Sequence, residues 1–450
     1  MKKRIVNFLG FIVIVEMILG GLGNIFYLPI RKGIFLFTLI FFFYFILTER
    51  RKVNKRYIIN IIWVGIFIFY GVAVGLVYKN DIGEIISTCN VFLGILYLII
   101  LSIYLDDDVI KIKKVINLIV NLIVILSMVT LIIFIASRFF MPSYWQFVNN
   151  IIELNLKLNY GLITGGLYSY NYVRVYFFNG IYMQLGLVLL IFRVTDDENS
   201  NFKTDMIKLI VVSMAILASG TRGYWLGSCI VIAISFVYLM ANIKNVKIKI
   251  KPLIIILSLI IIVLLIFPKT INNKSIINII KGESGIVYGQ GIEVDTQSRI
   301  ESITDFKNDP SNSVRSIQFK FLSNKIKQKP IFGWGFGATI PEYVDYMKSN
   351  NLQQVSASSF ELYYIELLFK TGIIGIALIL LYLITRLVQL IKLLRFLTKD
   401  EKNMLVSFTI GFVSCIASSF TNPYFAGLTG FFIIVLEIYI FETFRIKYLS

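Results

Sequence analysis

The stretch SSFELYYIELLFKTGIIG (residues 358–375) is apolar enough to enter a lipid bilayer, yet it carries Glu361 and Glu366 near its start. It follows a long segment of the chain that lacks extended apolar runs. A carboxylate at the edge of a bilayer costs free energy, so we expect a chain that keeps one there to pair it with a cation or to use it in its function. The stretch therefore indicates both a helix that enters a membrane and a place to look for chemistry.

The composition of the whole chain favours a membrane protein. Of its 450 residues, 57% are hydrophobic and 16% are charged, whereas soluble globular chains carry about 25% charged residues. The apolar residues form runs close to the roughly 20 residues that cross the core of a bilayer. We therefore predict an all-α integral membrane protein that crosses the membrane many times.

The apolar runs predict about twelve transmembrane helices in a single polytopic membrane domain, residues 1–450. Their expected ranges are 6–29, 33–48, 57–77, 84–104, 115–136, 176–193, 205–220, 223–242, 252–268, 360–385, 404–421 and 424–443. When the strongest Lys and Arg clusters are placed in the cytoplasm, both termini also lie inside. A large extracytoplasmic loop, residues 269–358, then connects spans nine and ten.

Residue usage disfavours several classes of function. The net charge of +18 comes from short clusters between apolar runs, which is typical of topology signals and not of a nucleic-acid interface. The chain has no histidine, and Cys89, Cys229 and Cys415 lie inside apolar segments. We expect no metal site, no cofactor and no disulfide framework. Any general base must be Asp, Glu, Lys, Tyr or a group of the substrate.

Three arginines lie on the outer side of the predicted topology. Arg174 lies at the mouth of span six, Arg222 lies in the tight turn SGTRG (219–223), and Arg315 begins an amphipathic helix. The apolar stripe of that helix comprises Val314, Ile317, Phe321, Leu322 and Ile326. Three guanidinium groups could together bind a pyrophosphate, because their planar forks match phosphate oxygens and stay charged. For each arginine, a lipid-headgroup anchor is the alternative.

The helix runs into KPIFGWGFGATIPEY (329–343). Its glycines resemble those of a phosphate loop, but no strand precedes them, which disfavours a nucleotide site. We expect a flexible turn that brings the backbone close to a bulky ligand. Trp334 and Tyr343 are candidates for stacking on sugar rings, with an aromatic belt at the membrane interface as the alternative.

Charged residues at two further places lack an explanation in the sequence. Glu16 and Glu437 lie inside predicted spans, where an ionisable group either pairs with a basic residue or is functional. Arg31 and Lys32 fall in the first outer turn, against the preference for positive charge inside. The local sequence does not decide the role of any of them.

Taken in order, these features resemble the O-antigen ligase and polymerase superfamily (Wzy/WaaL-like proteins). The features are Arg174, SGTRG at 219–223, the arginine-led helix that runs into KPIFGWGFG, and YYIELLFKTGIIG at 363–375. The resemblance implies a GT-C-like glycosyltransferase that needs no metal. It also implies that the active site faces outward from the bacterial cytoplasmic membrane.

The resemblance further implies a donor glycan carried on undecaprenyl pyrophosphate, held by Arg174, Arg222 and Arg315. In the ligases of the superfamily, a histidine eleven residues before the first glycine of the closing motif acts as the base. Counting back from Gly372 reaches Glu361, so this chain has a carboxylate in place of the imidazole. That departure favours a repeat-unit polymerase over a ligase, with Glu361 as the candidate for its catalytic base. An interfacial glutamate paired with a lysine is the alternative.

We therefore expect a polymerase of surface polysaccharide, of the O-antigen or capsule type, that transfers a glycan to a lipid-linked repeat unit. One alternative is a ligase that moves the finished glycan to a lipid or wall acceptor. The other is a polysaccharide flippase or transporter, although a carrier of two six-span halves would place its long linker after span six. Expected partners are the lipid-linked oligosaccharide and membrane lipid, with a chain-length regulator and a flippase as further candidates.

The predicted topology can be tested with cysteines introduced at Ser311 and Thr398. In intact cells, a membrane-impermeant thiol reagent should label position 311 and leave position 398 unlabelled, because only the first lies outside. Permeabilised cells, in which both positions should react, provide the control. The opposite labelling pattern in intact cells would show that the topology is inverted.

Overall fold

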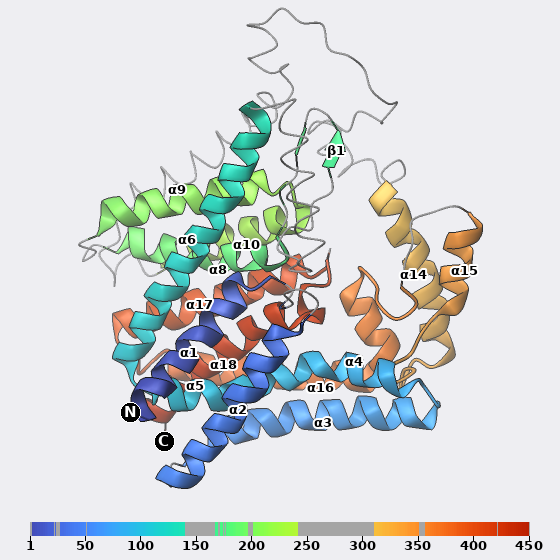
Figure 1. Ribbon diagram of the computed structural model, residues 1–450, viewed down its shortest axis with the longest axis horizontal. Helices are drawn as coiled ribbons and strands as arrows, with labels where there is room; N and C mark the ends of the chain where they lie inside the picture. Colours follow the sequence, from blue (N-terminus) through green and yellow to red (C-terminus); the bar gives the residue numbers. More distant parts are fainter. Residues whose placement is uncertain are drawn as a thin grey trace, which may run out of the picture. The chain divides into compact units, whose positions relative to one another are not determined.

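The structure is a computed structural model. It describes residues 2–21, 23, 28–50, 52–139, 167–169, 172–173, 175, 177–196, 201–241, 310–350, 356–420 and 422–449. Among these residues the regular structure is helical, apart from one short antiparallel pair of strands, β1 (Leu167–Ser169) and β2 (Tyr172–Val173) (Figure 1). The predicted all-α class is confirmed.

The helices follow the predicted spans closely. They are α1 (Lys2–Leu19), α2 (Ile30–Glu49), α3 (Lys55–Val77), α4 (Ile82–Phe92), η1 (Leu93–Leu96), α5 (Tyr97–Leu105), α6 (Val109–Phe139), η2 (Phe178–Ile181), α8 (Tyr182–Thr195), α9 (Phe202–Ala218), α10 (Arg222–Ala241), α14 (Pro310–Gln328), α15 (Pro341–Ser349), α16 (Tyr363–Leu393), α17 (Lys399–Ser418), η3 (Tyr424–Ala426) and α18 (Leu428–Tyr448). Eleven of the twelve predicted ranges overlap helices, and range 252–268 lies outside the described residues. The first range was too long, because Gly21 and Gly23 adopt positive φ angles that end the helix after Leu19.

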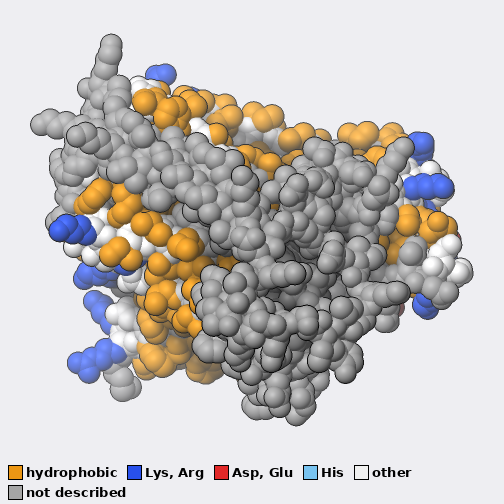
Figure 2. Space-filling model, turned by 90° about the horizontal axis from the view of Figure 1, so that it is seen from above, with side chains coloured by type: hydrophobic (Ala, Val, Ile, Leu, Met, Phe, Trp, Pro, Cys, Tyr) orange, Lys and Arg blue, Asp and Glu red, His pale blue; other side chains and the backbone are white. Residues whose placement is uncertain are grey.

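Seven helical segments in the described parts of the chain are long and apolar enough to cross a membrane. They are Ile30–Glu49, Lys55–Val77, Ile82–Leu105, Val109–Ile135, Phe178–Thr195, Arg222–Ala241 and Tyr363–Leu393. Their outer faces are strongly apolar: Leu47 is 77% exposed and Phe69 is 75% exposed. On the face shown in Figure 2, hydrophobic side chains cover much of the described surface. Such extended apolar surface is typical of a protein covered by lipid.

Contacts between Cα atoms divide the chain into two compact units. Unit 1 comprises residues 1–13, 35–114 and 310–450, and unit 2 comprises residues 14–34 and 115–309. In unit 1, α16 packs against α3 and α14, and α18 packs against α5 and α17. In unit 2, α8 packs between α9 and α10, and almost all of its side chains are buried.

Helix α16 is broken near the start of its long apolar run. Gly372 has φ +61° and ψ −169°, which no residue of a right-handed helix adopts. The N–H groups of Ile373 and Ile374 therefore lose their acceptors in the preceding turn, the carbonyls of Phe369 and Lys370. They donate instead to the carbonyls of Pro330 and Ile331, at 2.9 and 3.2 Å.

The turn GWGFG (333–337) uses the two carbonyls that the break leaves open. The N–H of Trp334 donates to Phe369 at 3.0 Å, and the N–H of Gly335 donates to Lys370 at 2.7 Å. All three glycines of the turn have positive φ angles, and a Cβ on Gly335 would lie 2.1 Å from the backbone nitrogen of Gly75 on α3. The close approach that requires these glycines is to the backbones of α3 and α16. The expected approach of the turn to a bulky ligand stays a prediction.

Substituting Gly335 by alanine tests this packing. We expect Gly335→Ala to lower the free energy of unfolding by at least about 2 kcal/mol, because φ is +82° and the new Cβ would overlap backbone atoms that cannot move aside. Gly65→Ala is the matched control, since nothing lies within 4 Å of its added Cβ on α3. Thermal unfolding in detergent measures both variants, and equal behaviour would contradict the close packing.

Candidate functional site

The structure brings two of the predicted site residues into contact. Arg315 lies in the second turn of α14, and its Nε is 2.8 Å from Oε2 of Glu361. The side chains are 21% and 40% exposed, so both reach the surface of unit 1, while the two contacting atoms are buried. Glu361 precedes α16 by two residues, whereas the sequence predicted that it lies on the helix itself. Its partner is an arginine, whereas the alternative role predicted from the sequence pairs it with a lysine.

Gln318 adds a second contact between α14 and the segment that carries Glu361. This side chain is 3% exposed, and its Oε1 accepts the backbone N–H of Glu361 at 3.1 Å. Its Nε2 donates to the hydroxyl of Tyr343 at 3.1 Å. Burial raises the pKa of Tyr343, so the phenol keeps its proton. Sequence analysis missed Gln318, although a polar residue within the apolar stripe of α14 was a usable signal.

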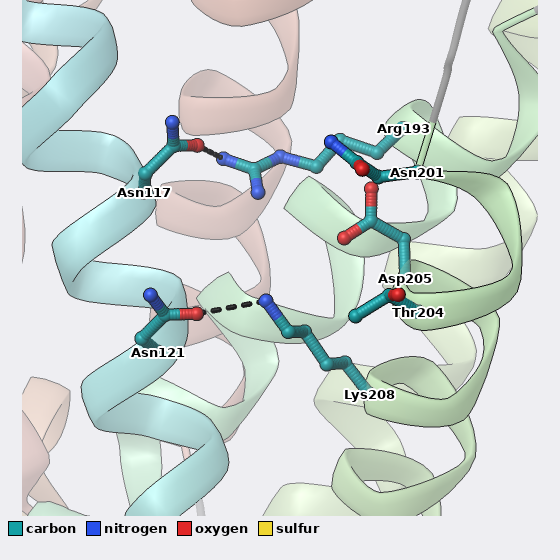
Figure 3. Close-up of a pocket in the computed structure, with 7 residues that line it drawn as sticks. All are labelled: Asn117, Asn121, Arg193, Asn201, Thr204, Asp205 and Lys208. Carbon is teal, nitrogen blue, oxygen red and sulfur yellow. Dashed lines mark hydrogen bonds between the residues drawn. The ribbon is translucent and has the colours of Figure 1, made fainter.

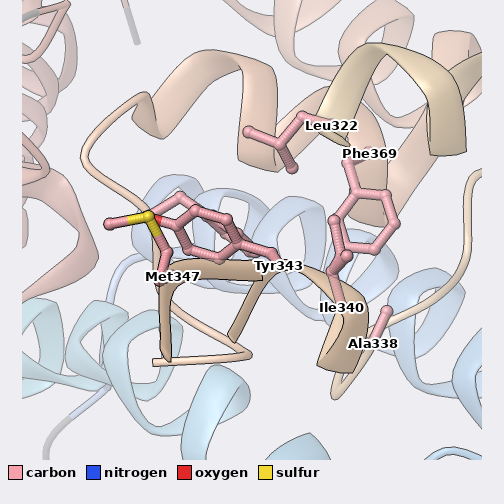
Figure 4. Close-up of a cluster of buried hydrophobic side chains, with 7 residues drawn as sticks. Leu322, Ala338, Ile340, Tyr343, Met347 and Phe369 are labelled. Carbon is pink, nitrogen blue, oxygen red and sulfur yellow. The ribbon is translucent and has the colours of Figure 1, made fainter. Parts of the chain in front are cut away.

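A hydrophobic cluster packs beside these contacts. Its buried members are Leu322, Ala338, Ile340, Tyr343, Met347, Phe360 and Phe369 (Figure 4). The predicted apolar stripe of α14 is confirmed, because Leu322 lies in this cluster and the other four stripe residues pack against it. Tyr343 is fully buried between Phe321 and Phe360. Its ring therefore offers no free face for a sugar, contrary to the expectation from the sequence.

Trp334 is partly buried beside this cluster. Its Nε1 donates to the carbonyl of Lys325 at 2.9 Å. The ammonium group of Lys329 lies 3.8 Å from the Trp334 ring centroid and 3.0 Å from that of Tyr78. One face of the indole thus binds a cation, and a ligand would have to use what remains of the ring.

Arg222 lies in unit 2, at the first residue of α10. The turn between α9 and α10 has only three residues, and Gly220 has a φ of +58°, so the predicted tight turn is confirmed. Buried Gln184 donates to the carbonyls of Gly223 and Tyr224, which fixes the start of the helix. The N-terminus of a helix favours anions, and a guanidinium placed there strengthens that preference. Arg174 lies outside the described residues.

Two comparisons with known proteins bear on this arrangement. Residues 207–380 match a protein family described as O-antigen ligase. Over 439 residues the chain is 24% identical to an O-antigen polymerase of Shigella flexneri, and the match covers 95% of this chain and 93% of that protein. These matches confirm the resemblance to the O-antigen ligase and polymerase superfamily.

The matched family range includes the contact between α14 and residue 361. It begins after Arg174 and contains Arg222, Arg315 and Glu361. It also contains YYIELLFKTGIIG (363–375), in which Gly372 is the break in α16. The backbone conformation at this position therefore requires the glycine.

Glu366 has a structural role that the sequence did not predict. It is buried, its Oε1 lies 2.6 Å from Nζ of Lys370, and its Oε2 accepts the backbone N–H of Phe360 at 3.1 Å. Lys370 also donates to the carbonyl of Ser358 at 2.9 Å. The two side chains together hold residues 358–360 against α16. The predicted span 360–385 put both Glu361 and Glu366 on a helix, which was wrong for Glu361 because α16 begins at Tyr363.

Glu16 and Glu437, whose roles the local sequence did not decide, both have basic partners. Glu16 pairs with Arg31 at 2.6 Å, which accounts for an arginine in the turn that the sequence predicted to lie outside. Glu437 pairs with Arg386 at 3.2 Å, and Arg386 also contacts Glu442 at 2.6 Å. Of the two alternatives for Glu16 and Glu437, pairing with a basic residue is therefore confirmed.

A polar pocket of about 330 Å³ lies in unit 2, among α6, α8 and α9 (Figure 3). Its lining residues are Asn117, Asn121, Arg193, Asn201, Thr204, Asp205 and Lys208. Arg193 donates to Oδ1 of Asn117 at 2.5 Å, and Lys208 donates to Oδ1 of Asn121 at 2.8 Å. These hydrogen bonds connect the three helices, and sequence analysis singled out none of the seven residues.

The structural role of the buried pair of Glu366 and Lys370 can be tested through protein stability. Glu366→Gln should lower the free energy of unfolding by about 3–5 kcal/mol, because it leaves Lys370 buried without a counter-charge. The double variant Glu366→Gln/Lys370→Met should recover most of this loss, since a neutral pair needs no counter-charge. Thermal unfolding in detergent measures both. A single variant as stable as wild type would contradict the structural role.

Proposed function

We propose that the protein is a polymerase of surface polysaccharide, of the O-antigen or capsule type. It transfers a glycan from undecaprenyl pyrophosphate to a lipid-linked repeat unit at the outer face of the bacterial cytoplasmic membrane. The contact between Arg315 and Glu361 carries the proposal, because it joins a cation suited to phosphate with a carboxylate suited to general base catalysis. The similarity to an O-antigen polymerase over almost the whole chain supports it.

The proposal includes the topology expected from the sequence. Twelve spans in a single GT-C-like membrane domain, residues 1–450, leave both termini in the cytoplasm. The loop 269–358 then lies outside, and it carries α14, α15 and Arg315. Glu361 follows directly, where the chain re-enters the membrane. The donor and acceptor lipids reach this position from the outer leaflet.

The proposed reaction is a displacement at the anomeric carbon of the donor. Glu361 takes the proton of the acceptor hydroxyl while the hydroxyl oxygen forms the new glycosidic bond. The bond between the anomeric carbon and the pyrophosphate oxygen breaks, and its electron pair leaves with undecaprenyl pyrophosphate. Arg315, Arg222 and Arg174 stabilise the charge on this leaving group. The reaction uses no metal and no cofactor.

The aromatic residues have unequal roles in this proposal. Trp334 contacts a sugar through the part of its ring that Lys329 leaves open. Tyr343 is buried, and it acts on the site only through its hydrogen bond with Gln318. A chain-length regulator and a flippase are the proposed protein partners of the pathway.

A ligase is the second candidate, because the family that matches residues 207–380 is described as O-antigen ligase. A ligase would transfer the finished glycan to a lipid or wall acceptor. The carboxylate at position 361, where ligases of the superfamily have a histidine, favours the polymerase. The two activities differ in what they make from lipid-linked repeat units alone: only a polymerase lengthens them.

The proposal is tested with the purified protein, lipid-linked repeat units and variants of two residues. Glu361→Gln should lower the rate of polymer formation about 10²- to 10⁴-fold, the usual contribution of a general base. Arg222→Lys should lower it roughly 30- to 1000-fold, because lysine lacks the planar fork that binds the leaving group. Rates are normalised to the amount of folded protein.

Arg395→Lys is the control, since Arg395 is an exposed arginine after the end of α16. It should polymerise at the wild-type rate. If Arg222→Lys and Glu361→Gln also do so, neither residue belongs to the active site. Product formed by the wild-type protein only after a second acceptor is added would identify a ligase.

A further inference from the structure

The contact between Arg315 and Glu361 engages two of the side chains that the proposed reaction needs. We propose that Arg315 restrains Glu361 in the unliganded protein, and that the diphosphate of the donor releases the carboxylate by binding Arg315 in its place. Gln318 keeps residue 361 in position during this exchange. The inference rests on the proposed function, because it requires a donor with a diphosphate.

The geometry of the ion pair makes such an exchange feasible. Nε of Arg315 and Oε2 of Glu361 lie 2.8 Å apart, but they do not meet at the angle of a hydrogen bond. A diphosphate offers several oxygens and more charge, so it can align with the guanidinium fork where the carboxylate does not. Both side chains are partly exposed, so the ion pair contributes little free energy. A ligand that must break the pair therefore binds only about 2- to 5-fold more weakly than it would without it.

The backbone of the segment is held much more firmly than the Glu361 side chain. Lys370 binds the carbonyl of Ser358, and Glu366 binds the N–H of Phe360. Gln318 binds the N–H of Glu361, and all three of the binding side chains are buried. When Arg315 changes partner, the carboxylate is therefore freed while its Cα stays in place. Gln318 acts as a positioning residue, since it contacts the base and not the substrate.

The exchange predicts that Glu361→Gln changes the affinity for the leaving group as well as the rate of the reaction. The variant should bind undecaprenyl pyrophosphate about 2- to 5-fold more tightly than wild type, because the carboxylate that competes for Arg315 is gone. The same variant should fail to make polymer. Binding of undecaprenyl pyrophosphate, without any glycan, is measured on the full-length protein in lipid nanodiscs.

Two further variants make this measurement specific. Glu342→Gln also removes a carboxylate paired with a cation of α14, Lys325 at 2.8 Å, and should leave affinity unchanged. Arg315→Gln/Glu361→Gln should lose the gain in affinity. Equal or weaker binding by Glu361→Gln than by wild type would overturn the exchange but leave the proposed function intact. Absence of binding by every protein, wild type included, would overturn both.

The role of Gln318 is tested by separating kcat from KM. Gln318→Leu should lower kcat about 10- to 100-fold through a displaced base, with little change in the KM for the donor. Gln328→Leu, an exposed glutamine at the end of the same helix, should change neither. Both are normalised to folded protein by thermal unfolding. If the kcat of the folded Gln318→Leu protein equals that of wild type, Gln318 does not position the base.

Discussion

The exchange of main-chain hydrogen bonds at Gly372 is the constraint on which the rest of unit 1 depends. A break in an apolar helix strands two carbonyls and two N–H groups, and such groups cannot stay unpaired in lipid. Residues 330–335 pair with all four, which presses the following glycine turn against α3 and α16. The path of this turn fixes where α14 ends and where α15 begins. The break in α16 thus constrains the segment that follows α14, the helix that carries Arg315.

Local pairing also governs the charged side chains, and it separates structural charges from exchangeable ones. Glu366 and Lys370 are buried together, so neither can leave without a large cost in free energy. Partial exposure alone does not distinguish the pair of Arg315 and Glu361, because Lys325 of α14 and Glu342 of α15 form another partly exposed pair. The difference lies in the backbone of residues 358–361, which is held by buried side chains of α14 and α16.

The sequence predicted the elements whose signal is local. The apolar stripe of α14 follows a period of 3.6 residues, and the turn at Arg222 is marked by two glycines. The partner of Glu361 was not predictable, because Arg315 is distant in the chain and the contact depends on the break at Gly372. The glycines of GWGFG indicated a close approach correctly. They could not indicate to what, since a ligand and a neighbouring backbone require the same absence of a side chain.

The absence of histidine explains why the proposed base needs the contact with Arg315. A neutral imidazole needs no counter-charge in an unliganded active site, whereas an ionised carboxylate in a half-buried position needs a cation nearby. That cation must also leave when the base is used. An arginine that the donor itself requires satisfies both conditions, because the arrival of the diphosphate supplies the new partner. In the proposed enzyme, replacing imidazole by a carboxylate therefore couples the activation of the base to the binding of the donor.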